Sequence, residues 1–329
     1  MIITQTPLRI GLLGGGTDLP SYYRHSGGRV LNCALDKYVY VIVKQRFDDD
    51  IYVNYSKKEI VQRVEDLEHE LVREAMQMTG VASGVEITTL ADIPSAGSGL
   101  GSSSAVTVGL LHALFAYQGQ QMSPEELAER ACTIEIDRCR KPIGKQDQYI
   151  AALGGIRDIR FGPGDEVVAE EVPLPPAERR ALQHQIMLFY TGITRSADLI
   201  LAEQNANVAV RRPQLDLLRD LAGFAVERLR GGDVDAIGPA VRESWEAKRK
   251  LASGVSNAQI DKTVTLALNA GASGAKLTGA GGGGFLLVIC PMERQRAVRE
   301  RLGHMRELPV KLDRLGSRVV LNVLRDIWG

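Results

Sequence analysis

The feature that most constrains this chain is a run of glycine and serine that leads directly into an apolar segment. Residues 94–105 contain three glycines and five serines, and the apolar residues 106–117 that follow are typical of a buried helix. Glycine lets the backbone approach a ligand closely, and a helix N-terminus offers unpaired N–H groups and the positive end of a dipole. A flexible linker is the alternative, but a linker would not run straight into an apolar helix. The pattern therefore predicts a loop that binds a polyphosphate, with a serine hydroxyl available to the accompanying Mg²⁺.

Two common nucleotide-binding motifs do not fit the sequence. No Lys-Ser or Lys-Thr pair follows the glycines of residues 94–105, so the loop is not a Walker A loop. A second glycine-rich segment, residues 276–285, lacks the preceding strand and the ribose-binding acid of a dinucleotide-binding fold. An NAD-binding function is therefore disfavoured.

Length, charge and cysteine content limit the class of protein further. The chain has 329 residues, enough for two domains, and its 40 basic residues balance 40 acidic ones. A neutral chain has no overall field that would attract nucleic acid or an anionic membrane, and no apolar run is long enough to span a bilayer. The N-terminus does not resemble a signal peptide, and the four cysteines are scattered without a CxxC pair. We expect a cytoplasmic protein with reduced thiols and no zinc site.

Periodicity and turn signals predict an α+β fold rather than a doubly wound sheet, because strands and helices do not alternate strictly. The expected strands are residues 2–13, 39–47, 51–55, 85–90, 185–190, 284–290 and 318–324. The expected helices are residues 59–78, 106–117, 123–138, 213–229, 236–251, 261–269 and 293–302. The charged turn at residues 48–50 predicts a hairpin between the second and third strands, and Ser123 with Glu126 predicts a capping box. A Pro-Leu-Pro-Pro run at residues 173–176 interrupts the pattern, and we place a domain boundary near residue 180.

The loop resembles the Pro-x₃₋₄-Gly-Leu-Gly-Ser-Ser-x-Ala signature of the GHMP kinases, with one extra residue between Pro94 and Gly99. The resemblance implies a two-domain kinase with an N-terminal domain like domain 2 of ribosomal protein S5 and a ferredoxin-like C-terminal domain. It also implies that ATP and Mg²⁺ are the cofactors. The residues implied in ATP binding are Pro94, Gly97, Ser98, Gly99, Leu100, Gly101, Ser102, Ser103 and Ser104.

Two further segments match family motifs that carry substrate and catalytic groups. Arg9, followed by residues 14–18, is similar to the N-terminal motif, in which an arginine lies near the transferring phosphate and an aspartate, here Asp18, binds sugar hydroxyls. Gly15 and Gly16 replace the Glu-His of galactokinases, which makes galactose a doubtful substrate. Taken alone, Gly14 to Gly16 could equally be a tight turn.

The segment at residues 144–149 resembles the family's Gly-x-x-Asp-Gln-Phe. The resemblance implies that Asp147 is the base or orienting group for the attacking hydroxyl and that Ser103 and Glu135 bind Mg²⁺. Lys145 could neutralise developing charge or keep Asp147 ionised. Singly, Asp147 and Glu135 could each be solvated surface carboxylates.

The glycines of residues 276–285 resemble the C-terminal motif, which lies against the phosphates and the substrate. The implied substrate-binding residues are Gly15, Gly16, Thr17, Asp18, Arg195, Gly281 and Gly282. Residues 14–20, 144–149, 190–195 and 244–248 are similar to the D-glycero-D-manno-heptose 7-phosphate kinase subgroup, and the fucokinase domain shares part of the pattern. This implies phosphorylation of an anomeric hydroxyl to give a 1,7-bisphosphate for nucleotide-activated heptose.

A sugar that is already phosphorylated needs basic side chains at its far end. Arg24, Arg29, Arg195 and Lys248 are candidates, and each could equally be a solubilising surface charge.

Other functions on the same fold stay open: a fucokinase-like or other GHMP sugar kinase, a kinase of an isoprenoid or amino alcohol, or a catalytically silent sugar or nucleotide sensor. We expect a monomer or homodimer that binds a small sugar phosphate, without nucleic acid or membrane partners.

Overall fold

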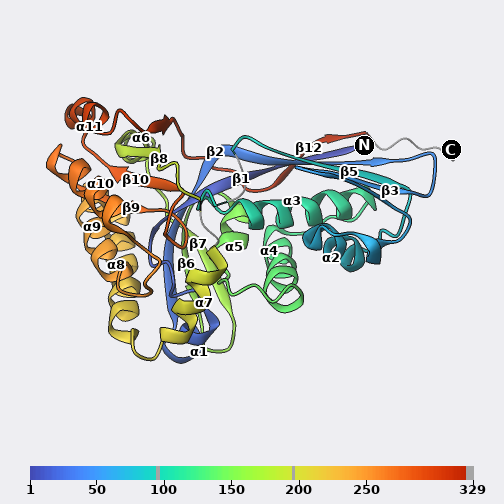
Figure 1. The fold of residues 1–329 in the computed structure, drawn as a ribbon, viewed down its shortest axis with the longest axis horizontal. Helices are drawn as coiled ribbons and strands as arrows, with labels where there is room; N and C mark the ends of the chain where they lie inside the picture. The colour runs from blue at the N-terminus through green and yellow to red at the C-terminus, as the bar shows by residue number, and fades with distance from the viewer. Residues whose placement is uncertain (94–96, 195–196, 324–329) are drawn as a thin grey trace.

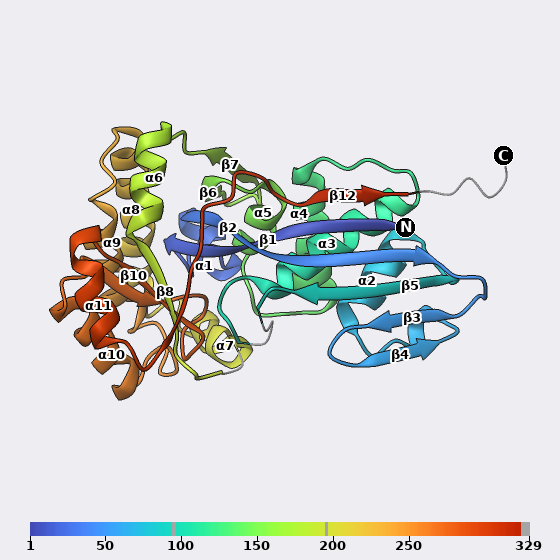
Figure 2. The same ribbon diagram turned by 90° about the horizontal axis from the view of Figure 1, so that it is seen from above.

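The computed structural model describes residues 1–93, 97–194 and 197–323. Within them, eight strands form one mixed sheet in the order β12-β1-β2-β5-β3-β4, and β6 and β7 extend it beside the first part of β2 (Figure 2). These strands are β1 (Ile2–Leu13), β2 (Gly28–Gln45), β3 (Ile51–Asn54), β4 (Lys58–Val61), β5 (Val85–Ala91), β6 (Ile156–Phe161), β7 (Val167–Glu171) and β12 (Arg318–Asn322).

The long strand β2 organises this sheet because it pairs antiparallel with β1 over most of its length. Its first part, Gly28 to Cys33, also pairs with β6, and its second part, Val39 to Gln45, pairs with β5. The antiparallel pairing carries β1 inward to Leu13, where the chain turns through residues 14–18. This arrangement places Arg9 and the following turn near the middle of the molecule.

Helices cover one face of the sheet, and α3 is the central one (Figure 1). It begins at Ser102, four residues before the predicted helix, and most of its residues are buried against β1 and β2. The helices and helical turns before the second sheet are α1 (Pro20–Ser26), the 3₁₀ turn Val64–Asp66, α2 (Glu70–Thr79), α3 (Ser102–Tyr117), α4 (Pro124–Cys132), the π-helical segment Thr133–Arg138, α5 (Gln146–Leu153) and α6 (Pro176–Gln185).

A second sheet has four antiparallel strands in the order β11-β8-β10-β9. The chain visits them as strand, helices, two strands, helix, strand, which is the ferredoxin-like arrangement implied by the sequence. Its strands are β8 (Ile186–Tyr190), β9 (Gly274–Leu277), β10 (Phe285–Ile289) and β11 (Arg306–Leu308). Its helices are α7 (Ala197–Asn207), α8 (Arg212–Arg230), α9 (Ile237–Lys248), α10 (Ala258–Asn269), the 3₁₀ turn Met292–Arg294 and α11 (Gln295–Arg301).

The predicted α+β class is confirmed, but the hairpin between the second and third strands is wrong. β3 pairs parallel with β5 and antiparallel with β4, and β5 lies between β3 and β2. The connection through residues 48–50 therefore crosses over β5, which lies between β2 and β3 in the sheet. A local turn signal does not reveal this, because the strand that fills the gap comes more than thirty residues later in the chain.

The predicted helix over residues 59–78 is right only in its second half. Residues before Glu70 form β4 and a 3₁₀ turn, and the helix starts where the His69 side chain accepts a hydrogen bond from the Val72 N–H. Gly80 ends it in a left-handed conformation, as expected. The capping box at Ser123 is confirmed by reciprocal bonds with Glu126. The Pro-rich run at residues 173–176 separates β7 from α6, and its last proline is the first residue of that helix.

Residue 180 lies inside α6, which connects β7 of the first sheet to β8 of the second. The chain returns to the first sheet at its end, because β12 pairs with β1. The domain boundary near residue 180 stays a prediction. None of the described helices is long and apolar enough to cross a bilayer.

Candidate active site

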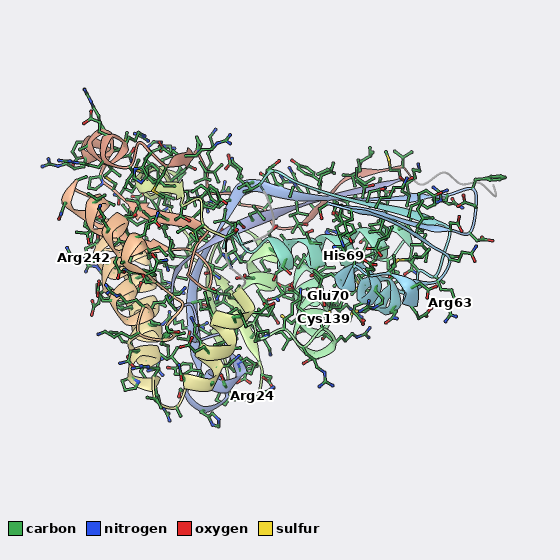
Figure 3. The ribbon with its side chains drawn as sticks, viewed as in Figure 1. Arg24, Arg63, His69, Glu70, Cys139 and Arg242 are labelled. Atoms are coloured by element: carbon green, nitrogen blue, oxygen red, sulfur yellow. The ribbon has the colours of Figure 1, made fainter. Side chains whose placement is uncertain are left out.

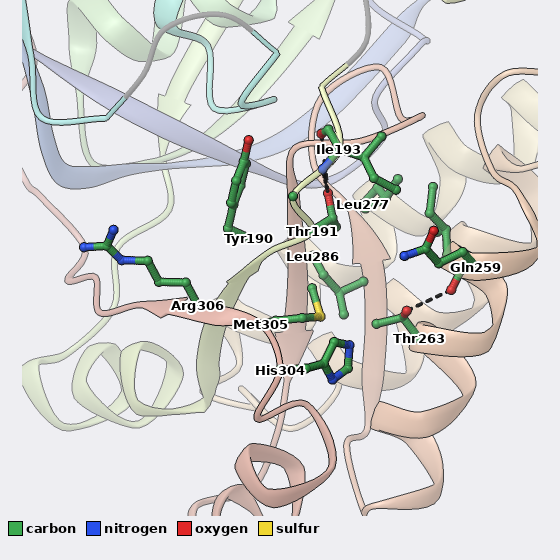
Figure 4. Close-up of a pocket in the computed structure, with 12 residues that line it drawn as sticks. Tyr190, Thr191, Ile193, Gln259, Thr263, Leu277, Leu286, His304, Met305 and Arg306 are labelled. Carbon is green, nitrogen blue, oxygen red and sulfur yellow. Dashed lines mark hydrogen bonds between the residues drawn. The ribbon is translucent and has the colours of Figure 1, made fainter.

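A cleft of about 350 Å³ lies where the glycine-serine loop, the turn after β1 and the second sheet's helices meet. Its charged lining residues come from distant parts of the chain and are Arg9, Asp18, Glu70, Glu135, Lys141, Asp147, Asp198 and Lys248. A second cavity of about 260 Å³ lies beside the second sheet, between β8, α10 and β11 (Figure 4). Its described lining includes no carboxylate, so it has none of the acidic groups that the family resemblance implies for the base and the Mg²⁺ ligand.

The glycine-serine loop passes closely against two other segments. Gly99 has φ +73°, and a Cβ there would lie 2.7 Å from the Thr278 Oγ1 of the second glycine-rich loop. Gly101 has φ +75° and would place a Cβ 3.0 Å from the Arg9 Cγ. Only glycine accommodates both the left-handed backbone and these contacts.

Helix α3 begins directly after this loop without a side-chain cap. The first N–H groups of the helix therefore lie at the cleft beside the lining residues Ser102, Ser103 and Ser104. Gly97, Ser98, Gly99 and Gly101 also line the cleft, whereas the Leu100 side chain is fully buried. Pro94 lies outside the described residues.

Arg9 and Asp147 form an ion pair at the base of the cleft. The Arg9 Nε donates to Asp147 Oδ1 at 2.7 Å, a second guanidinium N–H donates to the other carboxylate oxygen, and Arg9 Nη1 donates to the Gly99 carbonyl at 2.6 Å. Asp147 lies in the first turn of α5, where the helix dipole favours a negative charge. The pair therefore holds an ionised carboxylate in a fixed orientation, and it connects that carboxylate to the glycine-serine loop.

Ser103 and Glu135 lie side by side on the other side of the loop. The Ser103 hydroxyl donates to Glu135 Oε1 at 2.7 Å, and Gln148 Nε2 donates to the other oxygen at 2.6 Å. Complete burial raises the pKa of Glu135, and the ammonium of Lys141, 3.8 Å away, opposes that rise.

Within the described residues no group of three or more His, Cys, Asp or Glu could hold a metal ion on its own. A hydroxyl and a carboxylate do fit a Mg²⁺ ion that takes its remaining ligands from phosphates and water.

The turn after β1 presents Gly15, Gly16 and Asp18 to the cleft. Asp18 is buried, and its carboxylate accepts hydrogen bonds from the backbone N–H of Gly16 at 3.0 Å and of Gln146 at 3.4 Å. Burial, and secondly the charge of Asp147, raises the pKa of Asp18. Thr17 does not line the cleft. Its hydroxyl lies 2.8 Å from the Gly14 carbonyl and 2.9 Å from the Arg29 carbonyl, and so it holds the turn together.

The structure does not bring Lys145 to Asp147. The Lys145 ammonium donates to the Asp165 carbonyl at 3.0 Å and lies 3.6 Å from the Asp165 carboxylate, in a different pocket beside Tyr23. The reason is geometric: Lys145 precedes the first turn of α5, and its side chain leaves the helix on the side away from Asp147.

Several predicted substrate residues also lie elsewhere. Gly281 and Gly282 pack against Val255, where the Gly282 N–H donates to the Val255 carbonyl at 2.9 Å, while Gly279 and Ala280 line the cleft instead. Arg24 pairs with Asp165 at 2.9 Å near α1, at the lower edge of Figure 3, and Arg29 pairs with Asp158 at 2.8 Å. Arg195 lies outside the described residues.

Of the predicted basic candidates, Lys248 does line the cleft. It is the last residue of α9, its ammonium donates to the Gly279 carbonyl, and 7% of the residue is exposed. Burial, and secondly the charge of Arg9, lowers the pKa of Lys248 to about 8. Within the described residues no carboxylate lies within 4 Å of this ammonium.

The sequence reasoning missed five polar lining side chains, those of Glu70, Lys141, Gln146, Asp198 and Gln204. Gln146 stands inside the predicted motif at residues 144–149 and could have been included. Gln204 belongs to α7, a helix that no clear signal in the sequence predicted ahead of the single proline at the start of α8. Lys141 follows the π-helical segment in a short irregular stretch, and nothing in the local pattern marks it.

Comparison with known proteins finds one family in both halves of the chain. The family model for the GHMP kinases N-terminal domain matches residues 60–155, and the model for the GHMP kinases C-terminal domain matches residues 225–306. Together they cover more than half of the chain.

Similar curated proteins include a D-glycero-alpha-D-manno-heptose 7-phosphate kinase of Campylobacter jejuni, 28% identical over 93% of this chain and 95% of that protein. They also include the L-fucokinase/L-fucose-1-P guanylyltransferase of Bacteroides fragilis, 29% identical over 90% of this chain but 35% of that longer protein.

Among solved structures, a D-glycero-D-manno-heptose 1-phosphate kinase from Bacteroides thetaiotaomicron superposes with a TM-score of 0.81 at 24% identity. The alignment covers 98% of this chain and all of that one. The two family models, the shared fold and the converging loops lead to one conclusion: the chain belongs to the GHMP kinase family.

Proposed function

We propose that this chain, an ATP-dependent sugar kinase, phosphorylates the anomeric hydroxyl of D-glycero-D-manno-heptose 7-phosphate to the 1,7-bisphosphate. The observation that carries the choice of acceptor is the buried ammonium of Lys248, which lines the cleft without a carboxylate partner within 4 Å in the described residues. The similarity to a heptose 7-phosphate kinase over nearly the whole length of both proteins supports the same choice.

On the donor side, the ATP phosphates would bind the N–H groups at the start of α3 and the glycines of residues 97–101. Mg²⁺ would take the Ser103 hydroxyl and the Glu135 carboxylate as hard oxygen ligands, together with phosphate oxygens and water. When bound, the ion neutralises charge on the transferring phosphoryl group. Lys141, whose ammonium donates to the Ser103 hydroxyl at 3.2 Å, adds positive charge at the same place.

On the acceptor side, Asp147 would orient the anomeric hydroxyl and accept its proton as the oxygen attacks the γ-phosphorus of ATP. The new O–P bond forms while the bond from the γ-phosphorus to the leaving oxygen breaks, and ADP departs with that oxygen. Arg9 fixes the Asp147 carboxylate through two N–H donors and contacts the loop that would hold the phosphates. Most of the barrier reduction in such transfers comes from positioning and charge stabilisation.

On the side of the cleft formed by α9, Lys248 would bind the 7-phosphate. One of its three N–H groups donates to the Gly279 carbonyl, which leaves two for phosphate oxygens. Each charge-assisted hydrogen bond contributes roughly 1.5–3 kcal/mol, and an unphosphorylated sugar would leave the buried charge unpaired. Arg24 and Arg29 are less suitable, because each already pairs with an aspartate outside the cleft.

A fucokinase-like activity is the second candidate, supported by the similarity to the Bacteroides fragilis protein. A direct test presents the purified protein with ATP and Mg²⁺ and a panel of heptose 7-phosphate, L-fucose, galactose, mannose and mevalonate. ADP release would be measured, and the position of the new phosphate would be found by ³¹P and ¹³C NMR. We expect the heptose 1,7-bisphosphate as the best product. If a free sugar is turned over faster than the heptose 7-phosphate, the proposed acceptor is wrong and the kinase activity stands. If no compound of the panel causes ADP release, every acceptor in the panel is rejected.

A further inference from the structure

Helix α7 buries a polar side chain, that of Gln204, against the rest of the protein. The buried positions of α7 are Ile200 and Gln204, one helical turn apart. Ile200 packs against Gly254, with the Ile200 Cγ1 3.0 Å from the position of a Cβ there, and belongs to the core cluster that includes Val255. Gln204 occupies the position where a second apolar residue would complete this contact, yet it carries an amide.

The Gln204 side chain is buried and incompletely satisfied. The residue is 5% exposed, it lines the cleft, and its Nε2 has no hydrogen-bond acceptor among the described residues. Leaving a buried polar group without a partner costs about 1–3 kcal/mol, so such a group indicates a partner that comes from outside the chain. The cleft that it lines is the route by which that partner would arrive.

The surroundings of Gln204 identify the kind of partner. Its Oε1 lies 3.8 Å from the position that a Cβ on Gly16 would take, and Leu215 and Leu251 also lie within 4 Å of that position, so the amide borders the turn after β1. Asp18, two residues further along the same turn, presents a carboxylate to the same cleft. A carboxylate accepts from a hydroxyl, whereas an amide both donates to and accepts from one. Two such groups in the lining of one cleft suit the hydroxyls of a sugar.

We propose that Gln204 is a specificity-determining residue of the acceptor site and binds a sugar hydroxyl next to the one bound by Asp18. The inference rests on the proposed function only in that the acceptor is a sugar, and it holds for whichever sugar the enzyme phosphorylates. Because Gly16 lacks a side chain, the amide from α7 would supply a second polar contact beside that of Asp18.

The test replaces the amide by an apolar side chain of similar size, Gln204→Leu, with Glu203→Gln as the matched control on the same helix. The Glu203 carboxylate faces away from the cleft and accepts from the Ser253 N–H at 2.7 Å and the Ser253 hydroxyl at 2.8 Å. We expect Gln204→Leu to raise the acceptor KM about 10- to 100-fold, with the ATP KM within about twofold of the parent. Glu203→Gln should leave both KM values unchanged.

Stability separates this role from a structural one. Removing an unpaired buried amide should leave the melting temperature of the ligand-free Gln204→Leu protein equal to or above that of the parent. A lowered melting temperature with an unchanged acceptor KM would mean that Gln204 only supports the helix, and it would overturn the inference.

Deoxy analogues of the best acceptor in the panel identify the hydroxyl and do not depend on the stability of the variant. The analogue that lacks the bound hydroxyl should lose kcat/KM with the parent enzyme and lose much less with Gln204→Leu, whereas the other analogues lose equally with both. Equal losses for every analogue would refute the inference. Because the acceptor is chosen from the panel, a failure of the heptose assignment leaves this result interpretable by itself.

Discussion

The charged side chains of the cleft are mostly paired, and the pairs show which residues share a task. Arg9 is bound to Asp147, and Glu135 is bound to Ser103 and lies near Lys141. Lys248 differs, because its ammonium contacts a backbone carbonyl and, in the part of the chain described, no carboxylate within 4 Å. The paired groups are suited to fixed positions, and the unpaired cation is suited to an anionic ligand.

Asp147→Asn should keep ATP binding but lower kcat by about 10²-fold or more, because an amide cannot accept the proton of the sugar hydroxyl. The shape of the side chain is kept, so its contact with Arg9 is weakened rather than removed. Turnover measured under saturating substrates and ATP affinity measured by calorimetry check both parts. Asp137→Asn, which changes an exposed carboxylate, serves as control. Turnover near that of the parent would remove Asp147 from the mechanism.

Ser103→Ala and Glu135→Gln should each raise the Mg²⁺ concentration needed for half-maximal activity. Each substitution deletes a proposed hard ligand or its charge. A magnesium titration at fixed ATP measures the effect, with Ser56→Ala, which changes an exposed serine outside the cleft, as control. If the Mg²⁺ concentration needed for half-maximal activity is unchanged in both variants, the assignment of Ser103 and Glu135 as metal ligands is wrong.

The activity toward a phosphorylated acceptor should fall above about pH 8. Burial, and secondly the charge of Arg9, lowers the pKa of Lys248 to about 8, while the charges of Asp18 and Asp147 oppose this shift. The pKa of the neighbouring Lys276 is also lowered by burial. Because kcat/KM reports the free enzyme, it should drop about tenfold per pH unit as Lys248 loses its proton.

Two controls make this pH profile specific. Lys248→Arg should move the fall to higher pH, because a guanidinium keeps its charge. An acceptor without the phosphate should show no such fall. An identical profile for Lys248→Met and the parent would contradict the assignment of Lys248.

At the level of elements, the two glycine-rich loops act as one unit with α3. Gly99 lies against Thr278, and the Phe285 N–H donates to the Ser98 carbonyl at 3.2 Å, so the second loop supports the first. The start of α3 therefore depends on a contact between segments almost 180 residues apart in the chain.

Gly99→Ala should raise the ATP KM by about tenfold or more, because the added methyl would push the two loops apart. Gly119→Ala is a close control: it has the same φ of +73°, it follows the other end of α3, and a Cβ there meets nothing within 4 Å. Both variants should lose about 1 kcal/mol of stability through the left-handed backbone. Denaturant unfolding and ATP kinetics measure the two effects, and equal ATP KM values for both variants would disprove the contact argument.

Local sequence patterns predicted the elements that local chemistry determines. Helix α3, the capping box at Ser123 and the end of α2 at Gly80 depend on neighbours a few residues away, and the structure contains them. The order of the strands depends on distant partners, and there the prediction failed: β5 lies between β2 and β3, where the sequence suggested a hairpin.

The same distinction applies to the site. The motifs that resemble those of the GHMP kinases predicted one site containing Arg9, Ser103, Glu135 and Asp147. The structure places all four in one cleft, because each motif carries its side chain on an element with defined geometry. The motifs misplaced Lys145, since a residue just before a helix can turn its side chain either way. Gln204 comes from a helix that the sequence pattern did not reveal, so no motif pointed to it.

At the scale of the whole molecule, the cleft exists because two sheets are joined across it. The first sheet and its helices supply Arg9, Asp18, Ser103 and Asp147, and helices attached to the second sheet supply Gln204 and Lys248. We infer that the first group serves ATP, the reacting hydroxyl and, through Asp18, one further sugar hydroxyl, while the second group determines which sugar is accepted. Changes in α7 and α9 should therefore alter acceptor choice more than ATP binding.

The most direct test compares D-glycero-D-manno-heptose 7-phosphate with the same heptose lacking the phosphate, at pH 7 and saturating ATP and Mg²⁺. We predict that kcat/KM for the phosphorylated sugar is higher by on the order of 10³, the effect of two charge-assisted hydrogen bonds. The ratio should collapse toward one in Lys248→Met, while the exposed control Lys250→Met keeps it. Equal kcat/KM values for the two sugars with the parent enzyme would contradict the proposal that this kinase recognises a sugar phosphate.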